Sequence, residues 1–343
     1  MTDSLFLKTL SKQKHAETPI WIMRQAGRYL EEYRAVRATE PDFISFCLSV
    51  DKAVKVTLQP IERFNLDAAI IFSDILMVPW ALQRNVRFKT GTGPLLDPLE
   101  EPGILDDKLL DNIATSLAPV GKAIHKCRGE LASDKALIGF AGAPWTIITY
   151  MAEGGTSRDF PTARQWAWSD RKGVERLVDQ LVHATAEFLM IQAKNGADAL
   201  MLFDSWASAV PASQQKWLVI DPARRIIELL REAGVTQPII GFPKGIGEGL
   251  IAYADQTGVD GLGLDHGTDP MWAGKNLPKS LPLQGNLDPL SLISGGKDMF
   301  VAIDQIMESF HDRPHIFNLG HGITPPTPVA NVEALLDYVR TWS

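Results

Sequence analysis

Several features that mark other classes of protein are scarce or missing in this sequence of 343 residues. Only two cysteines occur, Cys47 and Cys127, and they are too few for a disulfide framework and too far apart for a Cys-x-x-Cys pair. No apolar run reaches the roughly 18 residues that span a bilayer, and the first residues do not resemble a signal peptide. These absences predict a soluble protein of the reducing cytoplasm, with no membrane partner.

Basic blocks and cofactor motifs are also missing. The net charge is −7, which argues against nucleic acid as the main partner. The sequence has no His-Glu-x-x-His, no Gly-x-Gly-x-x-Gly after a strand and no Gly-x-Ser-x-Gly. The glycine-rich stretch GFPKGIGEG, residues 241–249, lacks the Gly-Lys-Ser/Thr order of a phosphate loop. We therefore expect no metal and no organic cofactor.

What the sequence does contain is a series of short apolar runs separated by helical patterns. Each run is apolar nearly throughout, as parallel strands buried on both faces are. Residues 171–195 show helical spacing and end before Gly196, and a last helix is expected to open with Thr327 as its cap. The expected strands are 20–23, 68–72, 136–140, 199–203, 238–242, 261–265, 282–285 and 315–320. Eight strands alternating with helices predict an α/β fold, a single (β/α)8 TIM-like barrel over residues 1–343.

Polar side chains follow nearly every expected strand. In a barrel the functional residues lie on the loops after the strands, so these positions are the candidates. They are Arg24, Arg28, Asp74, Tyr150, Asp204, Ser205, Lys244, Asp265, His266 and His321, together with the glycine-rich turn at Gly142.

Each candidate also has a purely structural interpretation. Arg28 can pair with Glu31 or Glu32 on a solvated helix. Asp74 can cap the next helix, and so can Asp204 or Ser205. Tyr150 can be a tyrosine of the hydrophobic core. His321 lies between two glycines and can be a structural turn residue.

Six motifs resemble those of the uroporphyrinogen decarboxylase family, in the same order, from residue 19 to residue 325. They are WIMRQAGRYLEEYR, IIFSDILMVP, FAGAPWTIITYMAEGG, LFDSWAS, LQGNLDP and NLGHGITP. The resemblance implies a distorted (β/α)8 barrel, a homodimer and a place in heme biosynthesis. It also implies the reaction, in which the four acetate side chains of uroporphyrinogen III are decarboxylated to give coproporphyrinogen III.

The resemblance also implies which residues form the site. Residues matching the family's motif positions are Arg24, Arg28, Asp74, Tyr150, Ser205 and His321, with Gly142 and Phe203 at positions that line the family's cleft. Trp206, directly after Ser205, is a departure from the family pattern.

The chemistry of the reaction suits these residue types. Protonation of a pyrrole ring creates a cation that accepts the electrons of the departing carboxylate, so the substrate is its own electron sink. Asp74 would accept hydrogen bonds from the pyrrole N–H groups and stabilise the cation. Arg24 and Arg28 would hold substrate carboxylates bidentately. Two proton sources stay open: Arg28 acting through a bound water, and direct transfer from a group with a perturbed pKa.

Two other functions fit parts of this pattern. Similar barrels catalyse corrinoid-dependent methyl transfer with a zinc-activated thiol, which needs a His and Cys ligand set that this sequence lacks. A non-catalytic tetrapyrrole carrier would use the same arginines, and only turnover distinguishes it from a decarboxylase.

Overall fold

A parallel sheet of seven strands forms the centre of the computed structural model, which describes residues 3–13, 15, 17–89, 91–103 and 105–342. Its strand order is β1-β4-β5-β6-β7-β8-β9, and neighbouring strands pair in parallel. The strands are β1 (Ala68–Ile70), β4 (Ala136–Gly142), β5 (Ala199–Asp204), β6 (Ile239–Pro243), β7 (Gly261–Gly263), β8 (Leu283–Gln284) and β9 (His315–Ile316). Each lies within or overlaps one of the expected apolar runs, which confirms the α/β barrel class.

The remaining expected strand, residues 20–23, lies in segment 19–23, which joins the two edges of this sheet through a few bonds only. Ile20 forms a parallel bridge with Phe317, just beyond β9, and Trp21 N donates to the Phe317 carbonyl at 3.3 Å. On the other side, Asp67 N, just before β1, donates to the Ile20 carbonyl at 2.9 Å. Segment 19–23 therefore bonds to both edges of the sheet.

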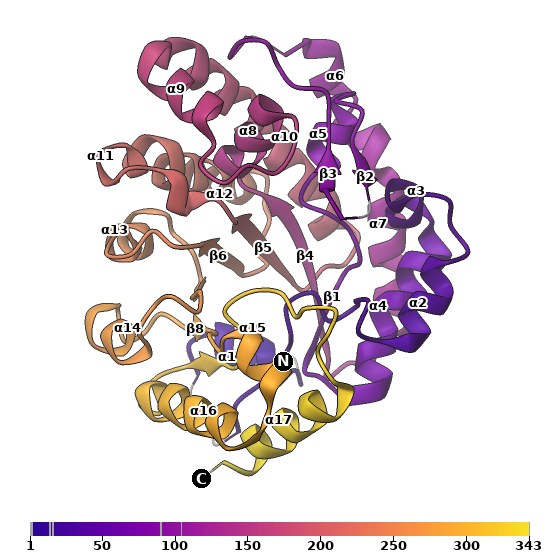
Figure 1. Cartoon of the computed structure of the whole chain (residues 1–343), viewed down its shortest axis with the longest axis vertical. Coiled ribbons are helices and arrows are strands. Elements are labelled where there is room, and N and C mark those ends of the chain that lie inside the picture. Colours follow the sequence, from indigo (N-terminus) through magenta and orange to yellow (C-terminus); the bar gives the residue numbers. More distant parts are fainter. Residues whose placement is uncertain (1–2, 14, 16, 90, 104, 343) are drawn as a thin grey trace.

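Helices surround the sheet (Figure 1). They are α1 (Leu5–Leu10), α2 (Glu31–Arg37), α3 (Phe43–Leu48), α4 (Val50–Phe64), α5 (Met77–Ala81), α6 (Asp107–Asp111), α7 (Ile113–Glu130), α8 (Pro144–Glu153), α9 (Pro161–Ser169), α10 (Arg171–Lys194), α11 (Ala212–Gln215), α12 (Asp221–Glu232), α13 (Gly249–Gln256), α14 (Pro270–Asn276), α15 (Pro289–Ser294), α16 (Gly296–Phe310) and α17 (Val329–Thr341), with a 3-10 turn η1 (Ala207–Ala209) and a π-helical turn η2 (Lys216–Ile220). Among the described residues, no helix has both the length and the apolar character to cross a bilayer.

Local signals explain where two of these helices begin and end. The Asp170 side chain accepts a hydrogen bond from Gly173 N at 2.9 Å and caps α10, and Gly196 follows the helix with φ of 106°. This confirms the helix expected over residues 171–195. The expected cap of the last helix was wrong: Pro328, not Thr327, precedes α17, because proline's fixed φ suits the extended cap position.

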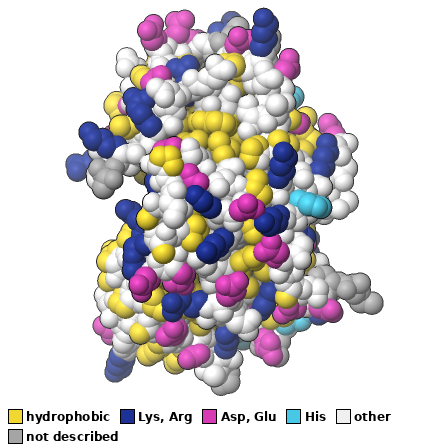
Figure 2. Space-filling view, turned by 90° about the vertical axis from the view of Figure 1, so that its right-hand side faces the viewer, with side chains coloured by type: hydrophobic (Ala, Val, Ile, Leu, Met, Phe, Trp, Pro, Cys, Tyr) yellow, Lys and Arg dark blue, Asp and Glu magenta, His cyan; other side chains and the backbone are white. Residues whose placement is uncertain are grey.

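A short antiparallel pair, β2 (Arg87–Lys89) and β3 (Gly93–Leu95), stands apart from the main sheet. The sequence did not predict it, since its residues are only partly buried and show no apolar run. Acidic and basic side chains are interspersed over the face that carries α2, α4 and α7 (Figure 2). The net negative charge is therefore not concentrated on that face.

Candidate active site

Arg24 lies in a strained turn directly after segment 19–23. Its φ of 64° falls in the left-handed region, which residues other than glycine rarely adopt. Gly322 makes room for it, because a Cβ on that glycine would collide with the Arg24 side chain. Ile323 N donates to the Met23 carbonyl at 2.9 Å and ties the two loops together. The turn therefore holds Arg24 against the loop that carries His321.

Two of the four arginines between residues 24 and 37 have structural partners. Arg34 Nη1 donates to the Arg28 carbonyl at 2.7 Å, and Arg37 Nη1 donates to the Glu40 carbonyl at 2.8 Å. These bonds stabilise the turns on either side of α2.

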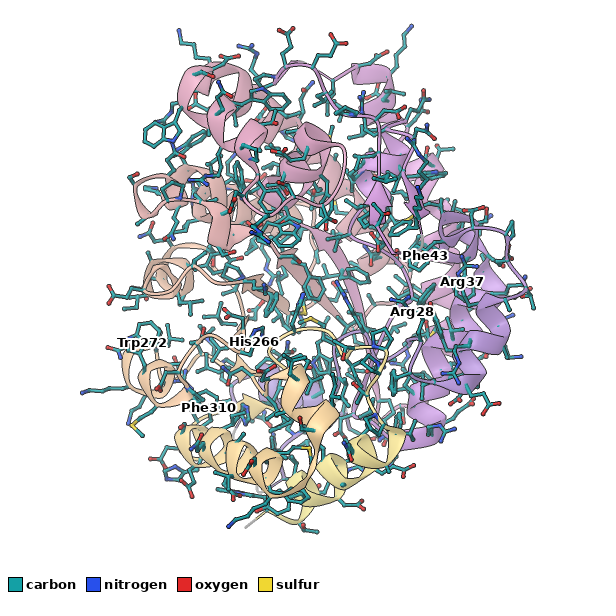
Figure 3. All side chains as sticks on the ribbon, in the orientation of Figure 1. Arg28, Arg37, Phe43, His266, Trp272 and Phe310 are labelled. Atoms are coloured by element: carbon teal, nitrogen blue, oxygen red, sulfur yellow. The ribbon has the colours of Figure 1, made fainter. Side chains whose placement is uncertain are left out.

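Arg24 and Arg28, by contrast, have exposed side chains, and neither guanidinium makes a hydrogen bond or an ion pair with any residue that the structure describes. Glu32 pairs with Arg63 at 2.8 Å instead of with Arg28. The interpretation of Arg28 as half of a surface ion pair was therefore wrong. In Figure 3, Arg28 lies on the side of α2, whereas His266 lies nearer the middle of the view.

Asp74 follows β1 and offers one uncommitted carboxylate oxygen. Its Oδ1 accepts a hydrogen bond from Leu76 N at 2.8 Å, whereas Oδ2 accepts none from the described part of the chain. Leu76 is the N-cap residue of α5, so the bond belongs to the turn before the helix and Asp74 is not its cap. Burial raises the pKa of Asp74 to about 6, and the Leu76 N–H and the positive charge of Arg24 oppose that rise.

Tyr150, on α8, lies close enough to Asp74 and Arg24 for their charges to act on its phenol. Its side chain is buried, and burial raises the pKa of the phenol. The charge of Asp74 raises that pKa as well, and the charge of Arg24 lowers it. The rings of Tyr150 and Trp206 meet edge to face, with their centroids 6.3 Å apart. The structure therefore brings Arg24, Asp74 and Tyr150 together.

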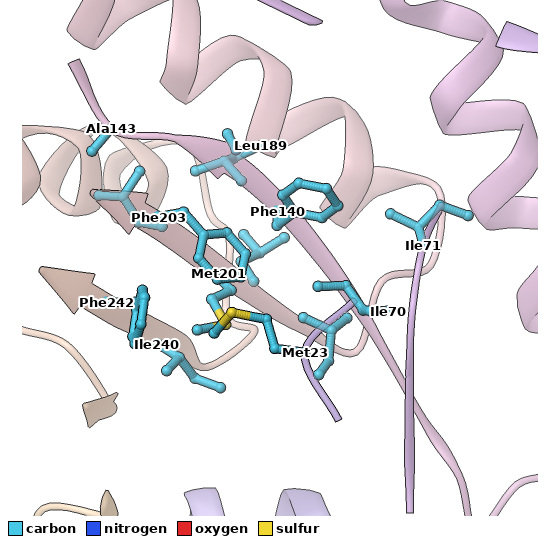
Figure 4. Packing of buried hydrophobic residues seen from close by; sticks show 14 of the residues in the cluster. Met23, Ile70, Ile71, Phe140, Ala143, Leu189, Met201, Phe203, Ile240 and Phe242 are labelled. Carbon is cyan, nitrogen blue, oxygen red and sulfur yellow. The ribbon is translucent and has the colours of Figure 1, made fainter. Parts of the chain in front are cut away.

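A row of aromatic rings links the ends of β4, β5 and β6 to His321. Phe203 lies between Phe140 and Phe242, with centroid distances of 5.5 and 5.8 Å, and Figure 4 shows the three rings on neighbouring strands. Phe242 stacks on the His321 imidazole at 6.4 Å, with an interplanar angle of 11°. Phe203 is thus a buried wall residue.

His321 is a neutral imidazole at physiological pH. Its pKa is lowered to about 3, chiefly by burial and in addition by the positive charges of Arg24 and Lys244 and by the nearby His266. Its Nδ1 is buried and finds no hydrogen-bond partner among the described residues. An unpartnered ring nitrogen inside a cationic group is more typical of a binding site than of a turn.

Gly142 and Ser205 complete the predicted set. A Cβ on Gly142 would lie 2.9 Å from the Ile75 carbonyl, so only glycine lets the loop after Asp74 sit this close to β4. Ser205 directly follows β5 and is partly buried.

Asp204, the last residue of β5, is buried, and its side chain links the end of β5 to α8 through a hydrogen bond. Its Oδ1 accepts a hydrogen bond from Thr146 Oγ1 at 2.5 Å, and the same hydroxyl oxygen accepts one from Trp206 N at 3.1 Å. Burial raises the pKa of Asp204 to about 7, against the effect of the Thr146 bonds. The bond to Thr146 ties the end of β5 to α8 and is not a helix cap.

Buried polar side-chain atoms without a hydrogen-bond partner also gather at the carboxyl ends of the strands. Such atoms are rare in folded proteins, and each one calls for a ligand or a water. Of eight in the described residues, five lie at or just beyond strand ends: Ser73 Oγ, Trp206 Nε1, Asn286 Oδ1, Asn318 Nδ2 and His321 Nδ1. Of these five residues, only His321 was predicted from the sequence as a site residue. The only signal for the other four was that all of them lie inside the motifs that carry the family resemblance.

The side chains that bind metals in proteins do not converge in the part of the chain that the structure describes. No group of three His, Cys, Asp or Glu residues there is placed to hold an ion. Cys47 and Cys127 are both buried and unpaired in the core. The methyl-transfer alternative therefore finds no zinc ligand set in these residues.

Comparisons with known proteins give one consistent family. The model of the family described as uroporphyrinogen decarboxylase (URO-D) matches residues 1–342. The uroporphyrinogen decarboxylase of Maricaulis maris is 46% identical over 340 residues, covering 99% of this chain and 98% of that protein. The one from Caulobacter vibrioides is 48% identical over 334 residues, covering 97% of this chain and 94% of that protein.

A solved structure extends the likeness to the fold. A methyltransferase from Methanosarcina mazei superposes with a TM-score of 0.79 over 99% of this chain and 98% of that one. At 18% sequence identity it shows the barrel architecture alone.

Proposed function

The chain belongs to the uroporphyrinogen decarboxylase family, and on that premise we propose that the residues around Asp74 are where it acts. The protein is a carboxy-lyase of porphyrin biosynthesis that decarboxylates uroporphyrinogen. One observation carries the assignment of the site. The Asp74 carboxylate, which has one uncommitted oxygen, lies within the electrostatic influence of the Arg24 guanidinium, which has no hydrogen-bond or ion-pair partner among the described residues.

Asp74 stabilises the charge that develops on the substrate. Loss of carbon dioxide leaves an electron pair on the former acetate carbon, and a pyrrole ring protonated beside that position accepts it. The free oxygen of Asp74 accepts the pyrrole N–H hydrogen bonds and favours the cationic ring. Because its pKa is about 6, the carboxylate is largely ionised at neutral pH, as this role requires.

Arg24 and Arg28 hold carboxylates of the substrate. Each guanidinium presents donors in a planar fork that matches a carboxylate, and neither is committed to a described protein acceptor. Tyr150, Ser205 and His321 bind and orient the ring and its side chains, with Gly142 and Phe203 shaping the wall. His321 is a poor proton donor, since its low pKa leaves the imidazole neutral at neutral pH, without the acidic proton of an imidazolium.

The test is turnover under anaerobic conditions. Purified protein is incubated with uroporphyrinogen, and the oxidised products are separated by chromatography. We expect conversion to the four-carboxylate product with intermediates of seven, six and five carboxylates. Unchanged substrate bound to the protein would instead identify a tetrapyrrole carrier.

We also propose that the chain works as a homodimer in the cytoplasm. Two of the most exposed large apolar side chains, Met271 and Leu290, are 75% and 61% exposed and lie in the first turns of α14 and α15. Apolar side chains of this size at the surface are suited to contact with a second copy. Two buried, unpaired cysteines are in keeping with a reducing compartment.

A further inference from the structure

Lys244 carries a positive charge that has no partner in the described structure. It directly follows β6, where its backbone N–H donates to the Asp204 carbonyl at 3.1 Å and fixes the start of the loop. Its side chain is partly buried, yet no described residue accepts a hydrogen bond or an ion pair from the ammonium group. Charges away from bulk water are normally paired, so a partly buried ammonium group without a protein counter-ion is a candidate to bind an anion.

The surroundings of Lys244 hold the ammonium group in place without neutralising it. Lys244 Nζ lies 5.8 Å from the centre of the Trp206 ring, in cation–π contact. Its charge also lowers the pKa of His321, so the ammonium faces the same group of residues as Arg24 does. Lys244 and Arg24 thus act on His321 from two different loops, one after β6 and one after segment 19–23.

Two nearby carboxylates have hydrogen-bond partners of their own. Asp265 accepts from Gly245 N and Gly267 N, each at 2.8 Å. Asp204 accepts from Thr146 Oγ1. Neither forms an ion pair with Lys244, so its charge stays available to an anion from outside the protein.

We propose that Lys244 is a third cationic anchor for substrate carboxylates, positioned by the Trp206 ring and separate from Arg24 and Arg28. The inference deepens the proposed function and rests on it. A cyclic tetrapyrrole carries eight carboxylates distributed around its rim, whereas Arg24 and Arg28 offer cations from one loop only. A cation after β6 adds a charged contact on a second loop, so carboxylates on different parts of the rim can be held at once.

The experiment compares four variants in the anaerobic turnover assay. Lys244→Met and Lys244→Gln remove the charge, and Lys244→Arg keeps it. Lys216→Met is the matched control, since Lys216 is exposed and already bonded to Asp221 at 2.7 Å. Loss of a charge-assisted hydrogen bond corresponds to a rise in KM of about 10- to 100-fold. We expect that rise in both uncharged variants with little change in kcat, and a KM near the parent's in Lys244→Arg and Lys216→Met.

A second readout separates binding from a structural role. If Lys244 holds a carboxylate, added salt should raise the KM of the parent more steeply than that of Lys244→Met. Trp206→Phe, which keeps an aromatic face, should preserve KM better than Trp206→Leu. An active parent whose Lys244→Met and Lys244→Gln variants retain its KM and its salt dependence would overturn the anchor and leave the decarboxylase intact. A parent that does not turn over uroporphyrinogen would overturn both.

Discussion

At the scale of single residues, Asp74 is governed by two opposing effects. Burial raises its pKa to about 6, and the charge of Arg24 holds that pKa lower than burial alone would set it. Motifs in the sequence identified both residues as candidates. They did not show that the two are electrostatically coupled, because that depends on the turn at Arg24 and on the glycine that accommodates its side chain.

The coupling predicts a shift in the pH dependence of the reaction. The acid side of the kcat/KM profile reports protonation of an essential base in the free enzyme. It should fall off near pH 6 in the parent, where Asp74 gains its proton. Arg24→Gln removes the charge that lowers the Asp74 pKa, so the fall-off should move to higher pH. An unmoved profile in a variant that still turns over would show that Asp74 and Arg24 are not coupled.

Asp74 should also cost the protein stability. The pKa of Asp74 in the folded state lies above its ordinary value of 3.8, so protonation of Asp74 stabilises the folded state. This stabilisation is complete below pH 3.8. This contribution is lost as pH rises through about 6. Above that pH, Asp74→Asn should therefore raise the free energy of unfolding, by on the order of 1–3 kcal/mol. Denaturant unfolding on either side of pH 6 checks this, and a variant less stable than the parent would contradict it.

At the scale of elements, the strands were far more predictable than the loops that carry the chemistry. Runs such as 136–140 and 199–203 are buried on both faces, so their composition identifies them. Segment 19–23 looked like any other strand, but in the structure it makes only a single isolated bridge. The unpartnered atoms of Asn286 and Asn318 could not be predicted, since satisfaction of a polar group depends on three-dimensional neighbours.

The contact between β4 and the loop after β1 offers a test at this scale. Gly142→Ala would place a methyl group 2.9 Å from the Ile75 carbonyl and push the loop that carries Asp74. We expect a loss of about 1–3 kcal/mol in stability, as for other overpacked sites, together with reduced kcat. The matched control is Gly129→Ala on α7, where nothing lies within 4 Å of the added carbon. It should leave activity unchanged and, as a helical glycine, gain about 0.5–1 kcal/mol.

At the scale of the whole molecule, assembly is the property to test. Sedimentation should give about twice the 37.8 kDa mass of one chain. A charge at either exposed apolar position, Met271→Glu or Leu290→Glu, should shift the protein toward the monomer. Trp168→Glu is the control, because Trp168 is 67% exposed but lies on α9, away from α14 and α15 in Figure 1. Equal dissociation by all three variants would remove α14 and α15 from the interface.

The whole enzyme is also predicted to work without an added metal or organic cofactor. The substrate supplies its own electron sink once a pyrrole ring is protonated. Prolonged treatment with a chelator, followed by the anaerobic assay, should leave the rate unchanged. A loss of rate that one particular metal restores would contradict this prediction.

The proposed role of the Asp74 carboxylate is to stabilise positive charge on the substrate ring during turnover. Asp74→Asn keeps the size of the side chain and one acceptor oxygen but removes the charge. Its kcat should fall by about 10²- to 10³-fold, as for other losses of a preorganised electrostatic group. The dissociation constant of the four-carboxylate product should change much less, since the charge acts mainly in the transition state. A folded Asn variant that turns over uroporphyrinogen at the parent's rate would contradict the claim.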